Sequence, residues 1–206
     1  MKGRVTHMVG IAGGTCSGKS WLAHYLKEAL GGDAALISQD WYYKDQSATP
    51  KRERAALNFD HPRAIENGLL LDHLDALRAG RTAATPRYHF ATHARAARTV
   101  PLEPAPVLIL EGLFVLHERS ILNRLDDSVF VDVPADVRLM RRVRRDSAER
   151  GIPAEETLRL YETFARPMHE RFVQPSAANA RQVWNPLTER DVPRRLAARI
   201  RQSLHA

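Results

Sequence analysis

A glycine-rich loop near the amino terminus constrains the fold of this chain more than any other feature. The loop follows the apolar segment 5–12 and precedes a helix-like segment that stops at two glycines. Its residues are Gly13, Gly14, Thr15, Cys16, Ser17, Gly18, Lys19 and Ser20. Glycines let the backbone curl with its N–H groups inward, and the following helix adds its positive end. Lys19 would reach the β- and γ-phosphates of a nucleotide, and the Ser20 hydroxyl would bind Mg²⁺.

The rest of the chain alternates strand-like and helix-like segments. Apolar runs predict buried strands at 34–38, 107–110, 129–133 and 182–184, and helical spacing predicts helices at 63–79, 134–151, from Pro153 onward and at 192–204. Residues 82–100 alternate irregularly and predict a hairpin or projecting flap. Strands that alternate with helices indicate a three-layer α/β fold with a central parallel sheet. No long linker interrupts the chain, so we expect one domain over residues 1–206.

The helix from Pro153 carries an apolar stripe that we expect to pack in the core. Its members are Leu158, Tyr161, Phe164, Ala165, Met168 and Phe172. They recur at the spacing of one helical face.

Composition places the chain among soluble globular proteins. No apolar run approaches the roughly 18 residues that a membrane helix needs, and one cysteine excludes an internal disulfide. We therefore expect a cytoplasmic protein without membrane contact. The net charge of +7 suits either nucleic acid or a nucleotide-polyphosphate site, and composition does not separate the two.

Two carboxylates stand at the ends of predicted strands. Asp40 follows the strand at 34–38, and Glu111 directly follows the strand at 107–110. Open α/β sheets bind their ligands at this edge. Asp40 could accept the proton of a substrate hydroxyl, or it could simply cap a turn. Glu111 could hold magnesium, directly or through water.

Arginines concentrate in the predicted helix 134–151. Arg138, Arg142 and Arg145 share one face, with Arg141 and Arg144 beside them. Phosphate would balance these charges, although a solvated basic face is the common alternative. Aromatic residues in segments of exposed character could stack on a base or belong to the core; they are Tyr42, Tyr43, Phe59, Tyr88 and Phe90.

Taken together, these blocks resemble the uridine kinase (uridine–cytidine kinase) branch of the P-loop kinases over roughly residues 7 to 184. The matching blocks are Gly13-Gly14-Thr15, Ser17-Gly18-Lys19-Ser20, Ser38 to Tyr43, Asn58-Phe59-Asp60-His61-Pro62, Tyr88 to Arg95, Glu111-Gly112, Phe130-Val131-Asp132, Arg138 to Asp146 and Glu149-Arg150-Gly151. The resemblance implies a kinase fold in which 134–151 is a helical lid and 82–100 is a nucleoside-binding flap.

The resemblance also implies an activity, the ATP- and Mg²⁺-dependent phosphorylation of the 5′-hydroxyl of uridine, and of cytidine as a further acceptor, to UMP or CMP and ADP. Asp40 is similar to the family's catalytic base, acting with Lys19, while Ser20 and Glu111 are similar to its magnesium ligands. The lid arginines that close over ATP would be Arg142, Arg145 and Arg150. The acceptor would contact Asp60 through its ribose and Tyr88 and His93 through its base, with Tyr42, Phe59 and Phe90 around it.

Two positions depart from the family pattern and keep other acceptors open. Ile152 and Leu160 occupy places where family members commonly carry an arginine and a glutamine. A related kinase would act on a phosphorylated sugar such as ribulose phosphate, on pantothenate or on nicotinamide riboside. A protein of another class, a nucleic-acid-binding ATPase, would use the basic helix. We expect a small-molecule enzyme that does not bind nucleic acid and assembles as a homo-oligomer, as family members often do.

Overall fold

A computed structural model describes residues 5–54, 57–90 and 92–204 of the chain. Residues 1–4, 55–56, 91 and 205–206 lie outside the described residues; they include both ends of the predicted domain 1–206 and one residue of the predicted flap.

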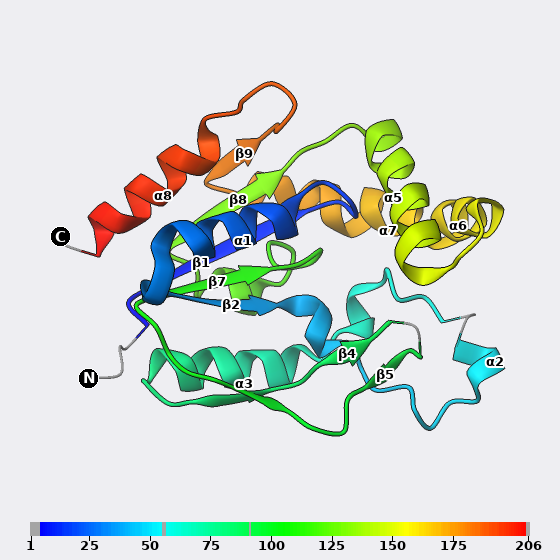
Figure 1. Ribbon diagram of the computed structural model, residues 1–206, viewed down its shortest axis with the longest axis horizontal. Helices are drawn as coiled ribbons and strands as arrows, with labels where there is room; N and C mark the ends of the chain where they lie inside the picture. Colours follow the sequence, from blue (N-terminus) through cyan, green and yellow to red (C-terminus); the bar gives the residue numbers. More distant parts are fainter. Residues whose placement is uncertain (1–4, 55–56, 91, 205–206) are drawn as a thin grey trace.

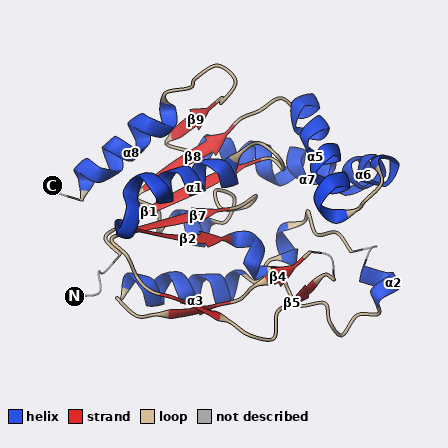
Figure 2. Ribbon diagram, in the orientation of Figure 1, coloured by secondary structure: helices blue, strands red, loops and turns tan. Residues whose placement is uncertain are grey.

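Five parallel strands form the central sheet, as the alternation of elements predicts (Figures 1 and 2). Their order is β2-β7-β1-β8-β9, and their bounds are His7–Gly13 (β1), Ala34–Ser38 (β2), Val107–Glu111 (β7), Asp127–Val131 (β8) and Gln182–Trp184 (β9). Every residue of β7 and β8 is buried. Helices cover both faces of such a sheet, which explains why its strands read as continuous apolar runs.

Helices pack on both faces and divide the core in two. On one face α1 (Lys19–Leu30) and α8 (Val192–Ser203) cover Val9 and Ile11 of β1. On the other, α3 (Asn67–Arg78) covers Met8 and Ala12. Successive side chains of a strand point to opposite faces, so β1 contributes to both layers. The three-layer α/β prediction is confirmed.

The predicted lid helix is α5 (Ala135–Arg150), which Gly151 ends with a φ of 65°. A helical arm follows over residues 154–179. It consists of α6 (Ala154–Leu160), a π-helical turn (Tyr161–Ala165), α7 (Arg166–Met168), a second π-helical turn (His169–Val173) and a 3₁₀ segment (Gln174–Asn179).

The π-helical turns change which residues of this arm are buried. Thr157, Tyr161, Ala165 and Val173 are buried, a set spaced by multiples of four residues, whereas Leu158 is 42% exposed. A π turn adds a residue to the helical repeat. The predicted stripe is wrong at Leu158, which lies in the regular helix α6 before the π turns.

A small β-structure forms the predicted flap. Two antiparallel pairs build it: β3 (Ala83–Thr85) with β6 (Val100–Leu102), and β4 (Tyr88–His89) with β5 (Ala94–Arg95). The flap thus extends two residues past the predicted boundary at 100. Two further short helices are α2 (Lys51–Arg54), which Figure 1 labels, and α4 (Arg119–Leu122). Among the described residues, no helix combines the length and apolar character needed to cross a bilayer.

Candidate active site

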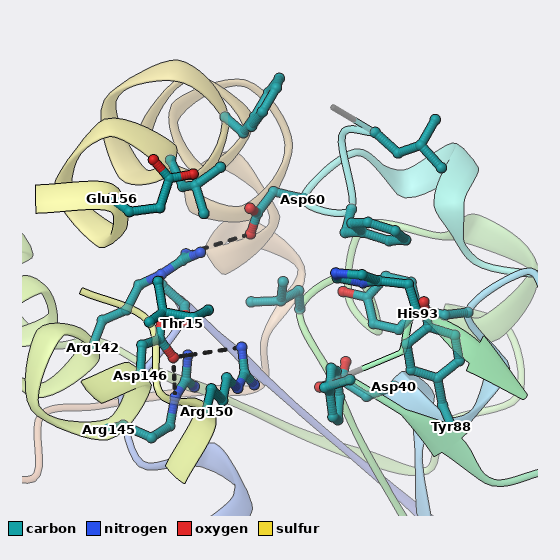
Figure 3. A pocket seen from close by; sticks show the side chains of 18 of the residues that line it. Thr15, Asp40, Asp60, Tyr88, His93, Arg142, Arg145, Asp146, Arg150 and Glu156 are labelled. Carbon is teal, nitrogen blue, oxygen red and sulfur yellow. Dashed lines mark hydrogen bonds and ion pairs between the residues drawn. The ribbon is translucent and has the colours of Figure 1, made fainter. Parts of the chain in front are cut away.

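A cavity of about 400 Å³ lies between the phosphate loop, α5, α6 and the flap (Figure 3). Eleven of the residues that line it are ones that the sequence predicts for the site: Thr15, Lys19, Asp40, Phe59, Asp60, Tyr88, Phe90, His93, Arg142, Arg145 and Arg150. These residues are spread over most of the chain. The fold therefore brings the predicted phosphate-binding and acceptor-binding groups to one place.

The phosphate loop has the backbone geometry that its glycines predict. Gly18 has a φ of 101° directly before α1, in the left-handed region that favours glycine. At Gly13, whose φ is 150°, an added Cβ would lie 2.5 Å from the carbonyl oxygen of Val131. Helix α1 starts at Lys19, so its positive end faces the loop. The local structure is suited to bind phosphate.

Glu111, at the carboxyl end of β7, joins the hydroxyls of Ser20, at the start of α1, and Ser38, at the carboxyl end of β2. Ser20 Oγ donates to Glu111 Oε2 at 3.1 Å, and Ser38 Oγ donates to Glu111 Oε1 at 2.5 Å. Among the described residues there is no group of three or more His, Cys, Asp or Glu side chains that could hold a metal ion alone. One carboxylate and one hydroxyl fit an ion such as Mg²⁺, which takes few protein ligands and completes its shell with water and phosphate oxygens.

Asp40 lies just beyond β2, in a 3₁₀ turn that spans Gln39–Tyr42. Burial, together with the nearby Glu111 charge, raises the pKa of Asp40 to about 6, against the opposing effect of Lys19. A carboxyl group with a pKa near neutrality is poised to exchange a proton with a substrate hydroxyl. Asp40 lines the cavity on the side opposite the lid arginines (Figure 3).

The flap supplies an aromatic wall. The rings of Phe59 and His93 stack at a centroid distance of 4.4 Å and an interplanar angle of 9°. The Tyr88 hydroxyl is buried without a hydrogen-bond partner among the described residues, and burial raises the pKa of Tyr88 to about 12. This hydroxyl remains protonated at neutral pH. Arg150 lies 4.7 Å from the centre of the Phe90 ring.

Asp60 connects the acceptor side to the lid. Arg142 Nη1 lies 3.7 Å from Asp60 Oδ1, and both side chains line the cavity. Burial raises the pKa of Asp60, although the arginines nearby oppose the shift. A carboxylate in this position can accept hydrogen bonds from the hydroxyls of a sugar.

Tyr42 does not lie where the sequence reasoning predicts. It is fully buried, its hydroxyl is 2.9 Å from His73 Nδ1, and it does not line the cavity. Tyr43 lines the cavity instead. The 3₁₀ turn points consecutive side chains in different directions, and only the second tyrosine faces the site. Tyr42 is a core residue, so its assignment to the acceptor site is corrected.

Sequence reasoning missed several residues of the cavity wall. They are Leu57, Leu113, Asp146, Glu156 and Phe164. The sequence leaves Tyr43 open between stacking on a base and packing in the core. Asp146 carried a detectable signal, since it lies four residues after Arg142 within the arginine-rich helix and is therefore its neighbour. Ile152 and Leu160, which depart from the family pattern, also line the cavity. Their apolar side chains replace polar groups on this wall.

Comparison with known proteins places these features in context. The sequence profile of the phosphoribulokinase / uridine kinase family matches residues 8–193. A protein named uridine kinase from Chloroflexus aurantiacus is 44% identical over 170 residues, which cover 82% of this chain and 81% of that protein. One of the same name from Staphylococcus epidermidis is 40% identical over 176 residues, 85% of each chain.

Solved structures share the fold at low sequence identity. A putative fructose transport system kinase from Silicibacter sp. TM1040 has a TM-score of 0.71 at 22% identity and covers 89% of this chain and 91% of its own. Phosphoribulokinase from Rhodobacter spheroides has a TM-score of 0.63 at 16% identity and covers 93% of this chain and 74% of its own. At these identities the likeness shows the fold alone.

Proposed function

Because the chain belongs to the phosphoribulokinase / uridine kinase family, we propose that it transfers the γ-phosphoryl group of ATP to the 5′-hydroxyl of uridine or cytidine. The products are UMP or CMP and ADP. Relatives named uridine kinase, 40% to 44% identical over more than four-fifths of the chain, support this acceptor class.

One observation carries the proposal: a single cavity joins the phosphate loop to an aromatic wall, and Asp40 lies in it. A kinase must hold a donor and an acceptor at once and orient one oxygen toward the γ-phosphorus. Lys19 and the lid arginines supply the donor half. Tyr88, His93 and Asp60 supply the acceptor half.

The donor half acts by neutralising charge. Backbone N–H groups of the phosphate loop and the Lys19 ammonium bind the phosphates, and Arg142 and Arg145 approach from α5. Charge builds on the transferring phosphoryl oxygens, so these cations stabilise the transition state more than the bound substrate. Ser20 and Glu111 would hold Mg²⁺, which, when bound, would neutralise part of the charge of the phosphates.

Asp40 acts on the acceptor. Its carboxylate accepts the proton of the 5′-hydroxyl as the oxygen attacks, and it fixes the direction of attack. The cavity that encloses it is lined by apolar side chains such as Leu57 and Leu113. These exclude water, which would otherwise compete for the γ-phosphoryl group.

Base and sugar are recognised by separate groups. Tyr88 and His93 line the cavity from the flap, where a pyrimidine base can stack and form hydrogen bonds. Asp60 accepts from the ribose hydroxyls. Ile152 and Leu160 offer no polar contact on their wall, so sugar recognition in this protein depends mainly on Asp60 and Arg142.

Coupled ADP-release measurements test the proposal. The protein is incubated with MgATP and, separately, with uridine, cytidine, purine nucleosides, ribulose phosphate, pantothenate and nicotinamide riboside. We expect uridine and cytidine to raise the rate of ADP release far above every other acceptor. A stronger response to a phosphorylated sugar or a vitamin would refute the nucleoside assignment and leave the kinase assignment intact.

A binding measurement separates the proposal from the nucleic-acid alternative. Backbone-driven nucleic-acid binding falls steeply with salt but persists at micromolar affinity under physiological conditions. We expect no oligonucleotide binding near physiological salt. Tight, salt-sensitive binding without nucleoside-dependent turnover would favour the nucleic-acid-binding ATPase.

A further inference from the structure

One buried carboxylate, Asp146, lies among the lid arginines. Asp146 is 2% exposed. Its carboxylate lies 2.8 Å from Arg145 Nη2, 3.4 Å from Arg142 Nε and 3.5 Å from Arg150 Nη1. Figure 3 shows it enclosed by these side chains on the lid side of the cavity. No step of the mechanism above uses Asp146.

The three arginines need this carboxylate to keep their arrangement. Their side chains are only 10%, 29% and 28% exposed for Arg142, Arg145 and Arg150, so water screens their mutual repulsion weakly. A single negative charge among them offsets part of that repulsion. It also leaves a net positive charge, which a polyphosphate requires.

Hydrogen-bond geometry shows that Asp146 orients Arg145 as well as neutralising it. Arg145 donates to Asp146 Oδ1 through Nε at 2.9 Å and through Nη2 at 2.8 Å. With these two groups engaged, the guanidinium plane of Arg145 is fixed. Its Nη1 group is left to face a ligand. A neutral partner would hold this plane less firmly.

Arg142 extends the network to the acceptor. It lies 3.4 Å from Asp146 and 3.7 Å from Asp60 through different nitrogens. Asp146, Arg142 and Asp60 therefore form a continuous chain of charges from the lid to the sugar-binding carboxylate. Loss of Asp146 would change the position of Arg142 relative to both substrates.

We propose that Asp146 is a positioning residue that sets the orientation of Arg142, Arg145 and Arg150 for phosphoryl transfer and couples them to the acceptor through Asp60. The inference rests on the proposed function of the site. It concerns a side chain that acts through other groups and does not require contact with the reacting atoms.

The substitution Asp146→Asn tests this role because it keeps the shape and removes the charge. The backbone carbonyl of Asp146, which accepts from the Ile152 N–H at 3.0 Å, is unaffected. We expect kcat to fall about 10- to 100-fold, as misplaced catalytic groups typically cause. Because the variant gains a net positive charge, we expect the Kd of MgATP, measured by calorimetry, to stay within about 3-fold of wild type.

A matched control separates positioning from general stability. Asp127 is also a buried aspartate, 8% exposed at its side chain, and it pairs with Arg199 at 2.7 Å, but it opens β8 at the amino end, away from the cavity. Asp127→Asn should lower the unfolding temperature and leave kcat within about 2-fold of the wild-type value. If both variants lose activity equally for an equal loss of stability, Asp146 has only a structural role.

A third measurement tests whether Asp146 couples ATP binding to acceptor binding. The Kd of the acceptor is measured with and without a non-hydrolysable ATP analogue. We expect the analogue to tighten acceptor binding to the wild-type protein about 5-fold or more, and to do so far less for Asp146→Asn. Unchanged coupling together with kcat near wild type would overturn the proposal.

Two further arrangements keep the test decisive. If Asp146→Asn does not fold, Asp146→Glu retains the charge and displaces it by one methylene. We then expect a folded protein with kcat about tenfold lower than that of the wild-type protein. A kcat equal to that of the wild-type protein would contradict the positioning role.

If the wild-type protein does not act on uridine or cytidine, the proposed function fails on its own. The variants are then compared with the acceptor that the panel of compounds identifies.

Discussion

At the scale of single residues, the protonation of Asp40 should set the lower pH limit of activity. Burial and the Glu111 charge raise its pKa to about 6, and a protonated carboxyl group cannot accept the proton of the acceptor hydroxyl. We therefore expect kcat/KM for uridine to fall about tenfold per pH unit below about pH 6 and to level off above it. A pH–rate profile measured at fixed MgATP checks this, and a flat profile down to pH 5 would contradict it.

Asp40→Asn provides the control for this assignment. The variant should lose about 10²- to 10⁴-fold in kcat, the range for a missing general base, while MgATP binding persists.

The native state holds the Asp40 proton more tightly than the unfolded chain, so wild-type stability falls as pH rises from about 4 to about 6. The variant should consequently unfold at a higher temperature than wild type above pH 6 and at an equal temperature below pH 4. Equal stability at both pH values would show that the pKa of Asp40 is not raised.

The unpartnered Tyr88 hydroxyl predicts a separation of stability from acceptor affinity. Tyr88→Phe removes a buried polar group that lacks a partner among the described residues of the free protein, so the unfolding temperature should hold or rise. The acceptor loses one hydrogen bond, and we expect its KM to increase about 3- to 10-fold with little change in the KM of ATP.

Tyr42→Phe is the matched control, because the Tyr42 hydroxyl is equally buried but lies 2.9 Å from His73 Nδ1 and outside the cavity. This variant should lose about 0.5–1.5 kcal/mol of stability and keep the acceptor KM of wild type. An equal increase of KM in both variants would mean that Tyr88 does not read the acceptor.

At the scale of elements, the flap depends on its docking to the rest of the fold. In the described part of the hairpin, two residue pairs join β4 to β5, and a hairpin of this size is not stable alone. Arg95 fastens it: Nε donates to the Tyr43 carbonyl at 2.9 Å, and Nη1 lies 2.6 Å from Glu66 Oε2. Arg95 is therefore one of the side chains that hold the acceptor wall in place, together with Arg54, whose Nη1 donates to the Thr92 carbonyl at 2.7 Å.

Arg95→Ala should release this wall. We expect the KM of the acceptor to rise about tenfold or more and the KM of ATP to stay within about 2-fold, since the flap carries Tyr88 and His93 but no phosphate ligand. The control is Arg124→Ala, which removes a bidentate pair with Asp75, both contacts at 2.7 Å, between elements outside the cavity. The KM values of acceptor and ATP are measured for both variants and compared at matched stability. An equal rise of the acceptor KM in both variants would show that Arg95 does not hold the acceptor wall.

Helices and strands whose apolar residues recur at a regular spacing were predictable from the sequence, and elements without such a spacing were not. The strand at 107–111 was readable because burial on both faces leaves an unbroken apolar run. Gly151 marked the end of α5 because a left-handed cap favours glycine. The burial of the arm 154–179 was only partly readable: Tyr161 and Ala165 are buried as predicted, but Leu158, in the regular helix α6 before the π-helical turns, is exposed.

At the scale of the whole molecule, the sequence predicted the site as far as parallel topology dictates it. Carboxyl ends of adjacent parallel strands meet at one edge, which brings Asp40 and Glu111 to the phosphate loop without knowledge of the loops between them. Which of two adjacent tyrosines faces the cavity depends on the torsion of a short 3₁₀ turn, and no periodicity predicts that. Asp146 was overlooked because its role arises only from the side chains around it.

The cavity walls come from segments that span most of the chain, so ligands should stabilise the protein as one unit. Lys19, Asp60, His93 and Arg145 belong to four different parts of the sequence. If residues 1–206 form one domain, unfolding is a single cooperative transition, and a ligand at 100 times its Kd adds about 2.7 kcal/mol. For a chain of this size that raises the unfolding temperature by about 5–11 °C.

MgADP and uridine should each shift one common unfolding transition, measured by calorimetry. Lys19→Ala should lose the MgADP shift and keep the uridine shift, whereas two transitions that respond to different ligands would show that the lid or flap unfolds independently.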